Sequence, residues 1–102
     1  MTRLEQLLRL VEMCPEDPLT HYAVALEYFN QQRFAEAVSA FEEALKIDPE
    51  YIAAYYHKAR AEIRADRKEA ARATLTRGVE IARRRGDRKT EREMGELLEP
   101  LR

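Results

Sequence analysis

Several residue types that mark particular classes of protein are scarce or missing in this chain of 102 residues. A single cysteine, Cys14, excludes an internal disulfide and favours a reducing compartment, so we expect a cytoplasmic protein. The 3 glycines stand singly, which excludes a glycine-rich phosphate-binding loop. No apolar run is long enough to cross a membrane, so we expect no membrane contact. With 45% hydrophobic residues, the chain predicts one folded domain.

Side chains that could catalyse a reaction or bind a metal are also sparse. His21 and His57 fall on different helical segments, with no Cys, Asp or Glu at a metal-ligand spacing. Cys14 has no nucleophile motif around it. We therefore predict a protein that is not an enzyme and has no metal or other cofactor. We expect His21 to be a buried or half-buried packing residue and His57 to be exposed.

The net charge of −1 hides an uneven distribution of charged side chains. Residues 1–50 carry 4 basic and 10 acidic side chains, whereas residues 51–102 carry 14 basic and 9 acidic ones. Such polarity can steer association with a partner or with a second copy of the chain. A nucleic-acid binder of this size would be basic throughout, so nucleic acid is the less favoured partner.

The sequence repeats itself with a period of 34 residues. A shift by this period places small residues on small ones, large on large and turn on turn. The matched pairs are Pro15 with Pro49, Ala25 with Ala59, Ala37 with Ala71, Phe41 with Leu75 and Ala44 with Gly78. The same shift places Leu7 on Phe41 and Val11 on Leu45, so the first segment also follows the repeat.

Within each unit, apolar residues recur at the spacing of a helix face. We expect six helices, near residues 2–13, 18–30, 34–47, 52–65, 68–85 and 88–100. Asp17 followed by Pro18 is a start signal for a helix. Gly86 can end the fifth helix in the left-handed conformation, and Asp87 or Thr90 can cap the next one.

These residues carry a resemblance to a known family. His21, Val24, Ala25 and Tyr28, followed by Ala37, Phe41, Ala44 and Pro49, have the spacing of a tetratricopeptide repeat, which the chain resembles. The second unit departs from the pattern, with Glu62 where a Tyr is usual and Arg83 where a Pro is usual. The resemblance implies an all-α fold, a short right-handed α-solenoid of antiparallel helix pairs with a C-terminal capping helix. We expect one domain over 1–102, in which 1–17 form a half-repeat, 18–51 a first repeat, 52–85 a second, degenerate repeat and 86–102 the capping helix.

The resemblance also implies a function, because the first helix of each pair lines a peptide-binding concave face in this family. Carried onto this chain, the groove residues are Tyr22, Leu26, Phe29, Tyr56, Arg60, Ile63 and Arg64. Aromatic and Arg side chains dominate binding energy at interfaces, and two Arg one turn apart favour a partner with acidic and apolar residues. Some family members clamp the C-terminal carboxylate of chaperones with Lys and Asn. The corresponding positions here are Tyr22, Leu26 and His57, so that activity is not expected.

Three readings remain open at this stage. The first is a protein–protein interaction module that binds a peptide or protein in the groove, and against it stands simple packing of the same side chains between helices. The second is a structural module that assembles into a homo-oligomer through contacts between its acidic and basic halves. The third is nucleic-acid binding through a basic patch, which comprises Arg83, Arg84, Arg85, Arg88, Lys89 and Arg92. No aromatic residue interleaves that patch, as base stacking would require.

Overall fold

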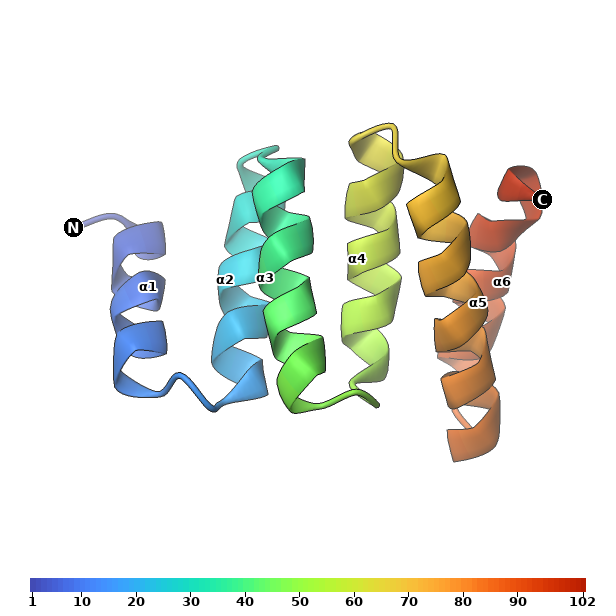
Figure 1. The fold of residues 1–102 in the computed structure, drawn as a ribbon, viewed down its shortest axis with the longest axis horizontal. Coiled ribbons are helices and arrows are strands. Elements are labelled where there is room, and N and C mark those ends of the chain that lie inside the picture. Colours follow the sequence, from blue (N-terminus) through green and yellow to red (C-terminus); the bar gives the residue numbers. More distant parts are fainter.

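The computed structural model describes residues 1–102 as six α-helices that form one row of antiparallel neighbours (Figure 1). The helices and the terminal 3₁₀ turn are α1 (Arg3–Met13), α2 (Pro18–Asn30), α3 (Phe34–Ile47), α4 (Ile52–Arg64), α5 (Lys68–Arg85), α6 (Arg88–Leu98) and η1 (Glu99–Leu101). The predicted all-α solenoid is confirmed. No helix combines the length and the apolar character that a membrane-spanning segment needs.

The observed helix ends agree with the predicted ones to within two residues and have local causes. Thr2 lies outside α1 as its cap, because its hydroxyl accepts from the Glu5 amide while the Glu5 carboxylate accepts from the Thr2 amide. Asp17 caps α2 and Asp87 caps α6, each through a carboxylate oxygen. The last predicted helix was too long by two residues, because the chain tightens into η1 at Pro100, which has no amide hydrogen to donate.

The 34-residue period seen in the sequence is present in the backbone and in its hydrogen bonds. The turns after α2 and α4 place Gln32 at φ 61° and Asp66 at φ 60°, one period apart. His21 Nε2 donates to the Pro15 carbonyl at 2.8 Å, and the Tyr55 hydroxyl donates to the Pro49 carbonyl at 2.7 Å. The same backbone turn and the same hydrogen bond to a proline carbonyl therefore recur in both repeats, although the side chains that form them differ.

Buried apolar residues form two clusters along the row of helices. One is centred on Phe41 between α2, α3 and α4, and the other on Leu75, Ile81 and Met94 between α4, α5 and α6. Small residues let the paired helices approach closely. Gly78 is the tightest such point, since a Cβ there would lie 2.9 Å from the Cβ of Tyr55 and 2.6 Å from the sulfur of Met94.

The helices fall into an inner and an outer set. Helix α4 contacts both α2 and α6, whereas α1, α3 and α5 do not contact one another. The helices α2, α4 and α6 are therefore closer together and line the concave side. Helix α1 stands apart at one end, packs only against α2 and contributes no buried residue (Figure 1).

Candidate functional site: a groove along α2 and α4

The seven predicted groove residues lie on α2 and α4, which the fold places side by side. Six of them are half-buried, and Arg64 is exposed. The apolar members pack against the two core clusters on one side, so each side chain contributes to the core and also to the surface. The structure divides them into two groups, one at each end of the groove.

The first group is built on stacked arginines. The guanidinium carbon of Arg60 lies 5.0 Å from the ring centre of Phe29 and 5.7 Å from that of Tyr56. The guanidinium carbon of Arg64 lies 4.7 Å from the ring centre of Phe34, which itself packs edge-on against Phe29. Cation–π stacking orients both guanidinium groups, and apart from the contact between Arg60 Nη1 and His57 Nδ1 their N–H donors stay available.

A hollow of about 180 Å³ opens beside these arginines. Its lining includes Phe29, Ile63 and, from α6, Leu97. The last helix therefore forms one wall of the groove at this end. Phe34 and Leu97 are members of the site that the sequence comparison with the family did not identify.

The second group is an aromatic cluster around Tyr22. This ring stacks on Tyr51 at 4.9 Å between centres and meets Phe41 and His57 at 5.8 and 5.9 Å. Burial raises the pKa of the Tyr22 hydroxyl above its usual range.

The prediction that His57 is exposed was wrong. Its ring is half-buried, stacked on Phe41 and in edge contact with Tyr56. Burial lowers the pKa of His57, and the nearby charge of Arg60 lowers it further, while Glu93 opposes them. A neutral ring can then accept a hydrogen bond through Nδ1, which lies 3.4 Å from Arg60 Nη1. The contact could have been anticipated from the period, which places His57 on the half-buried Ala23.

The arrangement offers hydrogen-bond donors and apolar surface. No group of three or more His, Cys, Asp or Glu side chains could hold a metal ion. Cys14 is exposed in the segment between α1 and α2. His21 is half-buried as predicted.

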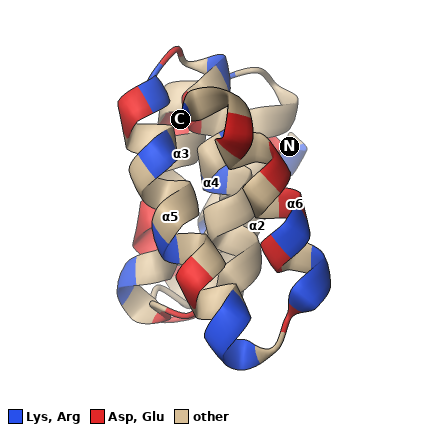
Figure 2. Cartoon of the chain, turned by 90° about the vertical axis from the view of Figure 1, so that its right-hand side faces the viewer, with Lys and Arg blue, Asp and Glu red and all other residues tan.

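The predicted basic patch is split by intramolecular ion pairs. Arg84 and Arg85 both donate to Glu50, and this contact holds the pKa of the Glu50 carboxyl below its usual range. Arg83 donates to Glu91 at 2.9 Å. Figure 2 shows basic residues gathered at the adjoining ends of α5 and α6.

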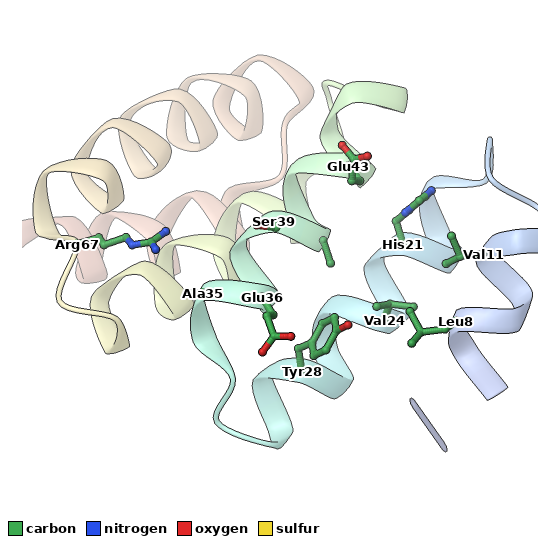
Figure 3. Close-up of a pocket in the computed structure, with 11 residues that line it drawn as sticks. Leu8, Val11, His21, Val24, Tyr28, Ala35, Glu36, Ser39, Glu43 and Arg67 are labelled. Carbon is green, nitrogen blue, oxygen red and sulfur yellow. The ribbon is translucent and has the colours of Figure 1, made fainter. Parts of the chain in front are cut away.

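The largest hollow lies away from the predicted groove, between α1, α2 and α3. It has a volume of about 530 Å³, and Leu8 of α1 faces Val24 and Tyr28 of α2 across it, with Glu36 and Glu43 on the α3 side (Figure 3). It is wide because α1 stands apart from α3, and nothing in the structure indicates what would fill it.

Sequence profiles of the tetratricopeptide repeat family match residues 28–88 and 2–52. This chain belongs to the tetratricopeptide repeat family. A comparison with curated protein sequences gives no match. Among solved structures, a tetratricopeptide repeat domain protein from Salinibacter ruber is 36% identical, with 85% of this chain and 88% of that one covered and a TM-score of 0.77.

Two more distant tetratricopeptide repeat structures share the fold and were solved with ligands. The TPR2B domain of yeast Sti1, in complex with pHsp70, is 22% identical over 96% of this chain and 78% of that one, with a TM-score of 0.89. The first TPR of Spaghetti (RPAP3), bound to the HSP90 peptide SRMEEVD, is 21% identical over 93% of this chain and 78% of that one, with a TM-score of 0.74.

Proposed function

We propose that this tetratricopeptide repeat protein is a non-catalytic interaction module that binds a peptide, or a segment of a partner protein, in the groove along α2 and α4. The observation that carries the proposal is that Arg60 and Arg64 are stacked on aromatic rings but have no carboxylate partner. Nine ion pairs form elsewhere in the molecule, yet neither of these arginines has a carboxylate partner. Positioned guanidinium groups without a partner favour a ligand that brings its own carboxylates.

The neighbouring surfaces favour apolar side chains next to those carboxylates. Phe29, Tyr56 and Ile63 offer half-buried apolar surface beside the arginines, and the hollow that reaches Leu97 can take one ligand side chain. The HSP90 peptide bound by the RPAP3 domain, SRMEEVD, is of the same chemical class, with acidic residues next to Met and Val. Because Tyr22, Leu26 and His57 replace the Lys and Asn of the chaperone clamp, a chaperone tail itself is not proposed.

The two other readings have less support in the structure. Self-assembly of acidic on basic halves and nucleic-acid binding both need free cations in the patch, and Arg83, Arg84 and Arg85 already have carboxylate partners. The remaining patch residues, Arg88, Lys89 and Arg92, form no ion pair. They lie outside the groove.

The test is a binding assay by fluorescence anisotropy on a library of short labelled peptides that combine Asp or Glu with Leu, Met or Val. We expect wild type to select acidic–apolar peptides over the same peptides with Lys in place of the acids. We expect Arg60→Gln with Arg64→Gln to weaken the selected peptide about tenfold or more, which corresponds to about 1.4 kcal/mol. The matched control is Arg9→Gln with Arg77→Gln, which removes the same charge from α1 and α5.

Two outcomes would contradict the proposal. One is equal weakening by both pairs of substitutions, which would mean that net charge alone attracts the peptide. The other is an absence of preference for acids over lysines. Sedimentation velocity of the protein alone, at low and high salt, runs beside the assay, and a salt-sensitive oligomer without peptide selection would favour the self-assembly reading.

A further inference from the structure

Another hollow, of about 410 Å³, lies between α5 and α6 at the end of the solenoid farthest from α1. Four arginines line it: Arg83 from α5, Arg88 and Arg92 from α6, and Arg102 at the C-terminal end. In Figure 2, which looks onto the α5–α6 end, basic residues surround the adjoining ends of these helices. The side chains come from three different segments, so the convergence is a product of the fold and is not visible in the run of residues 83–92.

The charge inside this hollow is only partly balanced. One carboxylate, Glu91, belongs to the lining, and it is already paired with Arg83 at 2.9 Å. Arg102 pairs with Glu99, which is outside the lining, at 3.5 Å. Arg88 and Arg92 have no carboxylate partner at all. The hollow therefore carries an excess of guanidinium groups that a compact anion could bridge.

The floor of the hollow contains a glycine that packing does not explain. Gly86 adopts φ 77°, and Gly78 has no room for a Cβ, so each of these glycines has a structural reason. Gly95 lies inside α6, and a Cβ there would meet no atom within 4 Å. Glycine weakens a helix interior, so the fold alone would favour alanine at this position. A glycine that weakens its helix without relieving a packing clash is expected where a ligand comes close to the backbone.

We infer that this hollow binds a phosphate monoester, such as a phosphorylated side chain of a partner protein. A phosphate dianion matches the planar donors of Arg88 and Arg92, and Gly95 leaves room for it to approach α6. The half-buried Val79 offers an apolar surface for the group that carries the phosphate. The lining holds no aromatic side chain on which a nucleobase could stack, which favours a compact group over single-stranded nucleic acid. This site is separate from the proposed peptide groove.

The experiment is an NMR titration of the ¹⁵N-labelled protein that follows the arginine Nε–Hε signals and the backbone amide signals of α6, which remain in every variant. The probes are inorganic phosphate, phenyl phosphate, adenosine monophosphate and a short single-stranded oligoribonucleotide. Two variants test the site: Arg88→Gln with Arg92→Gln removes the free donors, and Gly95→Leu fills the hollow while it favours the helix. The matched control is Arg84→Gln with Arg85→Gln, which removes the same charge outside the hollow, and Gly95→Ala tests the approach to the helix with the smallest side chain.

We expect saturable shifts of the Arg88 and Arg92 signals with phenyl phosphate. Affinity should fall about tenfold or more in both test variants, fall by a smaller amount in Gly95→Ala, and change less than about twofold in Arg84→Gln with Arg85→Gln. Tighter binding of phenyl phosphate than of inorganic phosphate would identify a phosphorylated side chain as the source, and tightest binding of the mononucleotide would identify a nucleotide. The inference is overturned if no monoester saturates the signals, if both arginine pairs weaken binding equally, if Gly95→Leu has no effect, or if only the oligoribonucleotide binds.

Discussion

The two ends of this short solenoid are built differently. At the N-terminal end, α1 buries no residue and touches only α2. The large apolar side chains that the molecule exposes all lie here, namely Met1, Leu8, Leu10, Met13 and Leu19. At the other end, α6 buries Met94 and Leu98 and contacts both α4 and α5.

The 34-residue repeat explains the difference. Helix α1 keeps the apolar face that packs against the next helix pair, but it lacks the face of small residues that packs against the other helix of the same pair. Leu7 and Val11 match Phe41 and Leu45 one period later, and they face α2 as those residues face α4. On the other side, Arg3 and Leu10 occupy the places of Ala37 and Ala44, which are fully buried against the paired helix. Large residues at these places exclude the close approach that Ala permits. Helix α1 therefore covers the next pair through its contact with α2.

The largest predicted effect compares the same substitution at the two ends. Leu98→Ala removes a buried side chain from the α4–α6 cluster and should lower the free energy of unfolding by about 2–4 kcal/mol. Leu7→Ala removes a half-buried one and should lower it by about 1 kcal/mol. Urea denaturation followed by circular dichroism measures both. Equal losses would mean that α1 is as firmly packed as α6.

A smaller effect separates the two helical glycines at the better packed end. Gly78→Ala should destabilise the protein by about 1–3 kcal/mol, because the new Cβ would force α4, α5 and α6 apart at Tyr55 and Met94. Gly95→Ala should stabilise it by up to about 1 kcal/mol, because nothing opposes the better helix former. Thermal melts of the two variants should shift in opposite directions. A stabilising Gly78→Ala would show that this end has more freedom to adjust than its contacts suggest.

The smallest predicted effect concerns a buried carboxylate on α4. Glu62 is only 3% exposed, and its Oε1 has no hydrogen-bond partner. Burial raises the pKa of Glu62, with Glu42 adding to it, whereas Thr74, Lys58 and Arg67 oppose the shift. The folded state therefore holds the proton more tightly than the unfolded state, so stability falls as pH rises above about 4.5.

Glu62→Gln should remove this loss and stabilise the protein by about 1 kcal/mol at pH 7, with little difference below pH 4.5. Urea denaturation across this pH range measures it, and Glu69→Gln, an exposed carboxylate on α5, is the control. Parallel stability curves for wild type and Glu62→Gln would show that the buried carboxylate is not under strain.

Much of the fold could be predicted because its determinants are local and periodic. Residue spacing, capping residues and the 34-residue shift predicted six helices whose ends lie within two residues of those observed. The differences arise where a capping residue lies just outside the helix and where Pro100 ends the last one. The composition of the groove followed from the family resemblance, and its role in binding stays a prediction.

What the sequence did not reveal depends on contacts between distant segments. His57 was expected to be exposed, whereas Tyr22 and Phe41 enclose it from two other helices. Glu50 neutralises Arg84 and Arg85 across more than thirty positions, roughly one repeat, so a run that reads as one basic patch is two separate regions. No pattern in a linear sequence indicates which side of a helix a remote carboxylate will reach.

The turns at Gln32 and Asp66 have a consequence for how such a chain can change in length. They share a backbone conformation although their side chains differ, so the arrangement of the two helices within each pair is set by the path of the main chain. A duplicated unit would keep the same internal turn, and it would join its neighbours through the segment in which the His21–Pro15 and Tyr55–Pro49 contacts recur one period apart. Recombination within the gene could therefore add or delete whole units while both dissimilar ends, with their separate surfaces, are inherited intact.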